Sequence, residues 1–322
     1  MKKFYVKLLI GILIFTLIFL VLNYFMDTDV INPYKARIIM LIGINIILGV
    51  SLNLVLGFTG QLTLGHAGFM AIGAYAAAVV SVKLQAPFLV ALIAGGVASG
   101  FIGMLIGLPV LKLKGDYLAI TTLAFGQIIL NVINNIEFIG GPRGFSVPPK
   151  TTFIWVFVFT ILSYFIINSI IKSSHGRAMV SIREDEIAAE AMGINAFKYK
   201  VMAFTIASFF AGIAGGLFAH FQGYITPNIF DFMKSVDIVT SVVLGGMGSL
   251  SGTVIATTVI TYLPEGLRSL SEYRMIIYPI LLIIMMRFRP KGLMGTNEIS
   301  FKGIQKFYKK LKGKGGKNNA AA

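Results

Sequence analysis

The chain of 322 residues is apolar and basic, with 56% hydrophobic residues, 13% charged residues and a net charge of +15. An ordinary soluble domain is about 25% charged, so this composition excludes a typical soluble enzyme or binding domain. The lack of cysteine in the sequence also excludes disulfides, thiolate metal sites and cysteine nucleophiles.

Long apolar runs recur along the chain, and about 20 apolar residues suffice to cross the hydrocarbon core of a bilayer. The runs cover residues 8–26, 38–57, 67–82, 86–111, 117–136, 151–171, 201–225, 238–264 and 275–288. We therefore predict an all-α, polytopic transmembrane helical bundle of about eight to ten spans, with no sizeable soluble domain.

The first run, residues 8–26, follows three lysines and superficially resembles a signal peptide. It is long enough to span a membrane, and no small-x-small cleavage site follows it. We predict a retained transmembrane helix and an external loop over residues 1–35.

Positive charge is concentrated after the last apolar run, with ten Lys and Arg residues between positions 287 and 317. The positive-inside rule and attraction to anionic lipid explain a cluster at this place, so we expect no nucleic-acid partner. Residues 296–322 are predicted to form a basic cytoplasmic tail, partly disordered.

The predicted crossings can be counted from a cytoplasmic N-terminus. The loop 172–200 and the short loop with Lys112 and Lys114 then lie in the cytoplasm, and the loop 137–150 lies outside. Three crossings after residue 200 would leave the basic tail outside, against the positive-inside rule. At least one broken or re-entrant segment is therefore expected, with both termini cytoplasmic.

The best candidate for such a segment is 238–264, because residues 245–252 read GGMGSLSG. Four glycines and two serines form a poor continuous helix. Irregular backbone at membrane depth survives only where protein buries it or where it lines a watery cavity, and broken helices of this kind often form substrate paths in transporters. The alternative is a tight polar turn between two short spans, and the sequence leaves both open.

Small residues recur every four positions in several runs, which predicts close helix packing. They stand at 91, 95, 99, 103 and 107, at 212 and 216, and at 73 and 77.

Polar side chains share helical faces in two runs. Gln127, Asn131 and Asn134 fall on one face, and Asn45 and Asn53 on another. Because unpaired polar groups are costly in a bilayer, we expect both faces to point into the protein, where they line a path or form interhelical hydrogen bonds. The candidate path residues are Asn45, Asn53, Gln61, Gln127, Asn131, Gly245, Gly246, Gly248 and Ser249.

Catalytic and metal-binding patterns are missing from the sequence, which has no HExxH, GxSxG or GxxxxGK[ST] motif. Its three histidines, His66, His175 and His220, are scattered. We expect no catalytic residue, metal or cofactor on this chain, so that any ATP hydrolysis belongs to another chain. We also expect no charged residue well inside a span, which argues against a proton- or sodium-driven carrier.

The most distinctive polar stretch is SSHGRAMVSIREDEIAAEAMGINAFKYK, residues 173–200. Residues 182–192 predict a short helix with acidic residues in its first turn, where they suit the helix dipole, and Gly193 as its stop. A docking element for a cytoplasmic partner fits this stretch better than a solvated loop.

This stretch resembles the cytoplasmic coupling segment of ABC importer permeases. Six further stretches, in order, resemble the M-type permease subunits of branched-chain amino acid ABC importers, the LivM-like type, over about residues 36–295. They are LNLVLGFTGQLTLGHAGFMAIGAY (52–75), GDYLAITTLAFGQI (115–128), GGPRG (140–144), AFTIASFFAGIAGGLFAH (203–220), VVLGGMGSLSGTVIA (242–256) and RPKGLMG (289–295).

The resemblance implies a permease domain over residues 36–295 with a cytoplasmic coupling loop at 172–200. It implies alternating access in a bacterial inner membrane, a homologous H-type permease, two cytoplasmic ATPases that hold ATP and Mg, and an extracytoplasmic solute-binding protein. The candidates for the ATPase interface are Gly176, Arg177, Arg183, Glu184, Ala188, Ala189, Glu190, Gly193 and Lys200. An importer for urea or short amides, and a stand-alone carrier or channel, stay open as alternatives.

Overall fold

The computed structural model describes residues 32–266, 280, 283, 287 and 292–295. The predicted first span, most of the predicted last span and the basic tail lie outside the described residues. The helices are α2 (Pro33–Asn53), which continues as the π-helical turn η1 (Leu54–Phe58), α3 (His66–Val82), α4 (Phe88–Val110), α5 (Asp116–Asn135), α6 (Phe153–Lys172), α7 (Ser174–Glu184), α8 (Glu186–Ala191), α9 (Ala196–Gln222), α10 (Phe232–Gly245) and α11 (Leu250–Gly266).

Short elements complete the described part of the chain. They are the 3-10 turns η2 (Glu137–Ile139), η3 (Gly141–Arg143) and η4 (Pro227–Phe230), and the strands β1 (Phe145–Ser146) and β2 (Tyr224–Ile225). Five described helices are long and apolar enough to cross a membrane: α2 with η1, α4, α5, α6 and α9. The predicted all-α polytopic bundle is confirmed.

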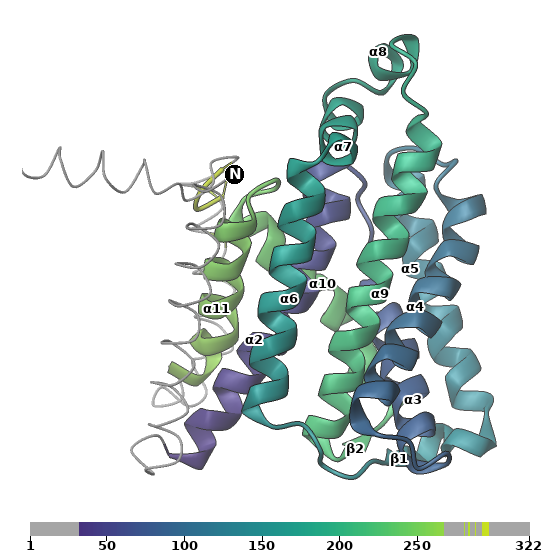
Figure 1. Ribbon diagram of the computed structural model, residues 1–322, viewed down its shortest axis with the longest axis vertical. Helices are drawn as coiled ribbons and strands as arrows, with labels where there is room; N and C mark the ends of the chain where they lie inside the picture. The colour runs from purple at the N-terminus through teal and green to yellow at the C-terminus, as the bar shows by residue number, and fades with distance from the viewer. Residues whose placement is uncertain (1–31, 267–279, 281–282, 284–286, 288–291, 296–322) are drawn as a thin grey trace, which may run out of the picture.

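The bundle has two distinct ends (Figure 1). Helices α7 and α8 stand at one end and the β1–β2 pair at the other. Lys114, in the loop before α5, lies 3.8 Å from Glu186 of α8, so both loops share the α7–α8 end. At the other end, β1 pairs with β2, and Lys150 donates to Ser81 at 3.4 Å. The predicted alternation of these loops is confirmed, whichever side of the membrane each end faces.

Helices α3, α4 and α9 form the tightly packed centre of the bundle. A Cβ on Gly73 would lie 2.2 Å from the Cα of Gly212, so only glycine allows α3 and α9 to approach this closely. Ser99 of α4 donates to the carbonyl oxygens of Phe69 at 2.9 Å and of Ser208 at 2.7 Å. The small residues therefore act as predicted, by bringing helix backbones together.

Two segments turn back into the bundle. After η1, residues 59–65 reverse direction, and His66 at the start of α3 lies 3.0 Å from Ser51 of α2. The chain also re-enters between α9 and α10, because Ser235 near the start of α10 accepts from the backbone N–H of Ala67. Both α3 and α10 consequently begin inside the bundle and span only part of its length. The prediction of at least one broken or re-entrant segment is therefore confirmed.

The glycine-rich stretch 245–252 is a turn at the α7–α8 end. Asn53 bonds to this turn, whereas Asn45, nearer the start of α2, bonds to Lys234 at the start of α10 and to Thr261 near the end of α11. Helix α10 thus runs parallel to α2, and α11 returns antiparallel. The predicted single segment 238–264 is two helices, so the alternative of a polar turn is the correct one.

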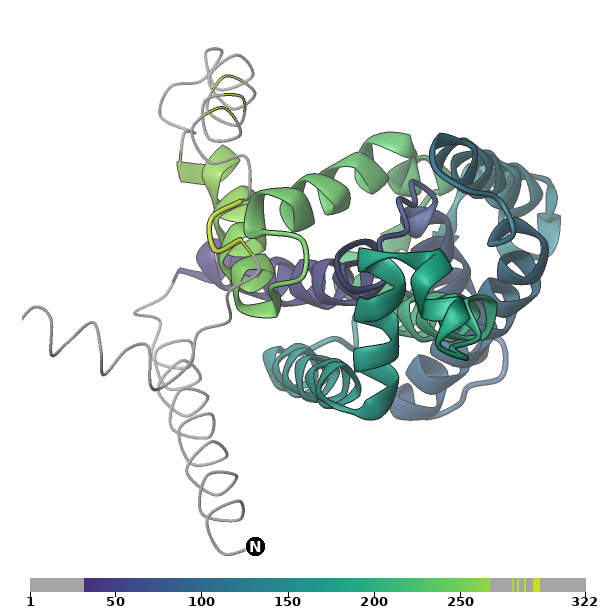
Figure 2. The same cartoon turned by 90° about the horizontal axis from the view of Figure 1, so that it is seen from above.

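Seen from the α7–α8 end, α11 lies at one side of the bundle and α4 and α5 at the other (Figure 2). Helix α5 lies outside the centre formed by α3, α4 and α9, at the periphery of the described bundle (Figure 2).

Candidate functional site

Helix α7 is fixed on the bundle by its first turn and its inner face. The side chain of Ser173 accepts from the backbone N–H groups of His175 and Gly176, which caps the helix. A Cβ on Gly176 would lie 2.1 Å from the carbonyl oxygen of Ile171, so Gly176 is required by the close turn between α6 and α7. Met179 and Ile182, on the inner face of α7, are buried. Gly176, predicted at the ATPase interface, is thus buried and allows the close turn between α6 and α7.

The short helix predicted over 182–192 is split at Asp185. This residue has extended backbone, and its carboxylate accepts from the N–H of Ala188 at 3.0 Å. Aspartate caps a helix better than it extends one, so Asp185 ends α7 and starts α8. Gly193, with a φ of +83°, closes the hairpin as predicted.

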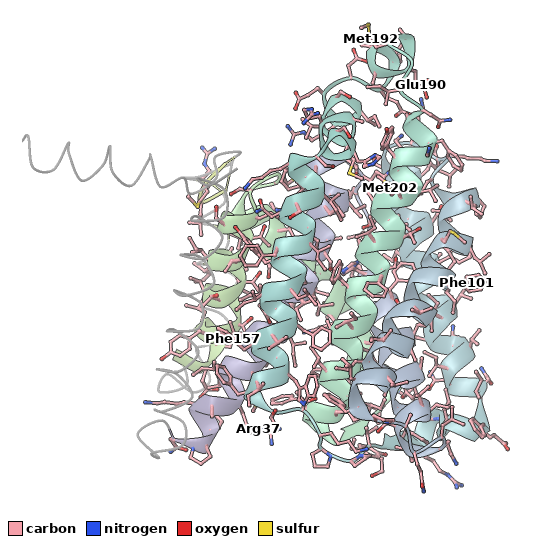
Figure 3. All side chains as sticks on the ribbon, viewed as in Figure 1. Arg37, Phe101, Phe157, Glu190, Met192 and Met202 are labelled. Carbon is pink, nitrogen blue, oxygen red and sulfur yellow. The ribbon has the colours of Figure 1, made fainter. Side chains whose placement is uncertain are left out.

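The tip of this α7–α8 hairpin is exposed and partly apolar. Ile187 is 77% exposed and Met192 is 83% exposed, with Ala188 and Glu190 beside them at the surface. Figure 3 shows Met192 and Glu190 at the far end of the molecule. Ala189 is buried and packs with Ile182 and Ala196.

Lys200 lies behind the hairpin rather than at its tip. It is buried, and its Nζ is 2.7 Å from the carboxylate of Glu186, which also faces Lys114 at 3.8 Å. Lys200 therefore fixes α8 on α9. Arg177 is exposed and only reaches the carbonyl oxygen of Lys172 at 3.5 Å.

Arg183 points inward from the end of α7. Its Nη1 donates to the carbonyl oxygen of Gly57 at 2.8 Å, and its Nε donates to Glu184 at 3.0 Å. A Cβ on Gly248 would lie 2.7 Å from the Arg183 Nη1, and one on Gly60 would lie 3.0 Å from its Cγ. The guanidinium thus occupies the space between η1 and the turn that joins α10 to α11.

Asn53 holds the same place from α2. It is completely buried; its amide donates to the carbonyl oxygen of Ser249 at 2.9 Å and to Thr253 at 2.7 Å, and its Oδ1 accepts from Gly248 N–H at 3.0 Å. We call the group of Asn53, Gly57, Arg183 and Gly248 the helix junction. It joins the hairpin to both helix breaks.

The four predicted path residues of the glycine-rich stretch lie in or beside this junction. Gly246 and Gly248 have φ values of +111° and +91°, which favour glycine. Gly245 packs against Gly252, where a Cβ on Gly252 would lie 2.1 Å from the Gly245 carbonyl oxygen. The stretch is filled by its own neighbours, with Ser249 also fully buried.

Gln61 lies in the re-entrant segment 59–65 and is 3% exposed. Within the described part of the chain, neither its Oε1 nor its Nε2 has a hydrogen-bond partner. A buried amide without partners costs about 1–3 kcal/mol, so this position suits a bound water or a polar group of a solute.

Lys234 corrects the expectation that no charged residue lies inside the bundle. Its Nζ donates to the side chain of Asn45 at 3.0 Å, and Asn45 donates in turn to Thr261 at 3.1 Å. The expectation was wrong because α10 begins at Phe232, before the apolar run at 238. Asp237 lies one helical turn further on and is exposed.

The polar face of α5 also lies elsewhere than expected. Gln127 and Asn131 are exposed, Asn134 is half-buried, and the nearby Ile128 and Val132 are 50% and 53% exposed. The expectation that this face points into the protein is wrong for the chain by itself, because α5 lies at the periphery. For Asn45 and Asn53 it is correct, and both form interhelical hydrogen bonds.

An apolar bundle with re-entrant half-helices and a polar hairpin at one end defines an α-helical integral membrane protein. Residues 34–286 match the family described as branched-chain amino acid transport system / permease component. The chain belongs to that family.

Several relatives are similar over most of the chain. It is 38% identical over 258 residues to the high-affinity branched-chain amino acid transport system permease protein LivM of Salmonella typhimurium, covering 69% of this chain. It is 25% identical over 253 residues to a probable LivM of Methanocaldococcus jannaschii, covering 70% of this chain and 73% of that protein.

A LivH permease of Escherichia coli is 29% identical over 188 residues, covering 57% of this chain and 60% of that protein. The match to the Salmonella LivM spans 61% of that relative's length. No solved structure matches the chain.

Proposed function

We propose that this chain is the M-type permease subunit of an ABC importer in the bacterial cytoplasmic membrane, which moves leucine, isoleucine and valine inward by alternating access. One observation carries the proposal: a hairpin with an exposed apolar tip is joined, through Arg183, to the junction of the bundle's helix breaks. The higher identity to LivM, 38%, than to LivH, 29%, favours the M-type.

The hairpin tip suits a cytoplasmic ATPase. Exposed apolar side chains such as Ile187 and Met192, on a segment rimmed by charges, would be buried by a docked protein partner. Two ATPase subunits, which bind ATP and Mg, would hold the hairpins of two permeases. Movement of the hairpin would then reach η1 and the α10–α11 turn through Arg183.

The exposed face of α5 suits the second permease. Gln127 and Asn131 would be costly against lipid tails. An H-type permease that covers this face would place the two amides at a shared interface, where they line the path for a zwitterionic solute.

The β1–β2 end suits an extracytoplasmic solute-binding protein. Its loops are braced by the pairing of Phe145 with Ile225 and by the bond from Val147 N–H to the carbonyl oxygen of Gly223 at 2.9 Å. A braced surface can receive a partner with little loss of conformational entropy.

A second candidate, a stand-alone secondary carrier, is favoured by Lys234 and Asp237, since such carriers use charged groups at membrane depth. The exposed hairpin has no role in that candidate. An importer for urea or short amides shares the ABC mechanism and differs only in solute.

Reconstitution separates the three candidates. Proteoliposomes would hold this chain, its permease partner and both ATPases, with ATP inside and binding protein outside. ATP-dependent uptake of labelled leucine, competed by isoleucine and valine, is the expected result. Uptake of urea would keep the ABC importer mechanism and show that the assigned solute is wrong. Leucine uptake by the chain alone without ATP would overturn the proposal of an ABC importer.

A further inference from the structure

A cavity of about 390 Å³ lies between α2, α10 and α11. It is in the half of the bundle nearer the β1–β2 end, because its α2 wall begins at Ile38, beside Arg37 at that end in Figure 3. This is the size of a small-molecule pocket. Its lining includes three charged residues: Lys234 and Asp237 of α10, and Glu265 at the end of α11, which already has a partner of its own.

The Lys234 and Asp237 charges attract one another but form no ion pair within 4.0 Å among the described residues, so each can still meet a ligand. An ammonium group has three donors, and among the described residues Lys234 Nζ donates only to Asn45. The carboxylate of Asp237 is exposed and has no hydrogen bond or ion pair within 4.0 Å in the described part of the chain. The two residues are three positions apart on α10, so their side chains lie on the same face.

The rest of the wall is part polar, with Asn45, Ser241 and Thr261, and part aliphatic. Ile38 and Leu41 of α2 face the cavity from one side, and Ile260 of α11 from the other. A ligand that matches both parts of the wall carries an anionic group, a cationic group and an aliphatic side chain. Urea and short amides carry no charge and leave Lys234 and Asp237 unmatched.

We infer that this cavity is a binding site for a zwitterionic aliphatic α-amino acid. The ligand's carboxylate meets the Lys234 ammonium, its α-ammonium meets the Asp237 carboxylate, and its side chain packs on Ile38, Leu41 and Ile260. The inference rests on the proposed function and gives the permease itself a recognition step. Selection for zwitterions is then made twice, by the binding protein and by the membrane domain.

The site is structurally connected to the helix junction. Asn45 and Asn53 lie on one face of α2, eight residues or about 12 Å apart along the axis. Helix α10 carries Lys234 in its first turn and ends at the turn that Asn53 holds. A solute on Lys234 therefore contacts the helix whose other end meets Arg183.

Because the sequence has no cysteine, a single reporter can be placed in the cavity. In the assembled complex without ATP or binding protein, Thr261→Cys would be labelled with a cationic thiol reagent in the presence of L-leucine, 4-methylpentanoate, isoamylamine or urea. Leucine is expected to slow labelling about fivefold or more at saturating concentration, because a bound ligand excludes the reagent. The two half-charged analogues should protect less, and urea not at all.

Matched controls make the result specific. Asn135→Cys, exposed at the end of α5 outside the cavity, should be labelled at one rate in every solution. Lys234→Met combined with Thr261→Cys should lose the protection by leucine, and Lys234→Arg should retain part of it. Ile38→Cys is a second reporter if Thr261→Cys does not assemble.

The outcomes separate the site from the proposed function. Unchanged labelling with leucine in both reporters, in complexes that still accumulate leucine with ATP, would overturn the site and leave the importer. Protection by leucine in a complex that transports none would keep the site and overturn the importer. Equal protection by urea would overturn the assignment of the ligand class.

Discussion

The guanidinium of Arg183 donates a 2.8 Å hydrogen bond to the carbonyl oxygen of Gly57, across 126 positions of sequence. Gly57 lies in the last turn of η1, where carbonyl groups lack helical partners and favour a cation. The bond ties the polar hairpin to a helix break in the bundle. Because a Cβ on Gly248 would lie 2.7 Å from the same guanidinium, the Arg183 side chain lies against both η1 and the α10–α11 turn.

Replacing Arg183 should uncouple the importer. In Arg183→Ala, ATP hydrolysis by the assembled complex persists, while leucine uptake falls about tenfold or more, since a lost bond from a charged donor is worth about 1.5–3 kcal/mol. Arg183→Lys should be intermediate, because a lysine cannot bond in two directions from a planar group. Parallel assays of leucine uptake and ATPase activity measure the ratio of uptake to ATP hydrolysis.

Arg177→Ala is the matched control for Arg183→Ala. Arg177 is an exposed arginine of the same helix, and it reaches only a carbonyl oxygen at 3.5 Å. Its loss should leave the ratio of uptake to hydrolysis unchanged. An equal loss in both variants would mean that the charge of the hairpin matters and the inward bond does not.

Asn53→Ala should destabilise the protein by about 3 kcal/mol, because it removes buried hydrogen bonds and leaves Gly248 N–H without its acceptor. Thermal unfolding in detergent, followed by tryptophan fluorescence or helical circular dichroism, checks the shift. The exposed Asn131→Ala is the control and should stay within about 0.5 kcal/mol. A similar stability for the two variants would contradict the assigned role of Asn53.

The close approach of α3 to α9 gives a steric prediction. Gly73→Ala places a Cβ 2.2 Å from the Gly212 Cα, and forced overpacking of this kind costs about 1–3 kcal/mol or more. Gly266→Ala meets its neighbours at 3.5 Å, an ordinary contact, and should be tolerated. The yield of folded protein and the midpoint of thermal unfolding distinguish the two, and an unchanged Gly73→Ala would exclude this packing.

The sequence predicted those parts of the fold that depend on composition and local pattern. Apolar runs located the described spans, and small residues at four-residue spacing located the close contacts of Gly73 and Gly212. Asp185 misled the prediction of a single short helix because its competing role as a cap depends on the local backbone. The turn at 245–252 could not be decided, since a glycine-rich stretch suits a re-entrant path and a tight turn equally.

The candidate site was less predictable because its contacts join distant positions. Arg183 was assigned to an outer interface, since its inward partner Gly57 has no side chain that marks it. Lys234 was missed because a charged first turn interrupts the apolar run by which α10 would be recognised. The polar face of α5 was found by its spacing, but its direction depends on which helices surround α5.

The hairpin tip gives a prediction about assembly. Ile187→Glu places a carboxylate on the exposed apolar tip, where burial against an ATPase would be costly. Copurification of the ATPases with the permease pair should fall several-fold, while the thermal stability of the permease pair itself is unchanged. Leu84→Glu is the control, because Leu84 is 70% exposed in the loop after α3, near Ser81 at the opposite, β1–β2 end. Equal copurification in both variants would argue against docking at Ile187.

The face of α5 that carries exposed amides should lie against the partner permease. Asn131→Cys, paired with single cysteines introduced along the partner's corresponding helix, should form a disulfide under mild oxidation, because cysteines bridge when their Cα atoms come within about 7 Å. Val97→Cys on α4 is the control; Val97 is 55% exposed on a purely apolar helix face that suits lipid. Cross-linking at position 97 without cross-linking at 131 would place the partner elsewhere and leave Gln127 and Asn131 without a role in a shared path. If the bond at 131 forms and its yield changes when ATP is added, α5 lies at a moving interface, as alternating access requires.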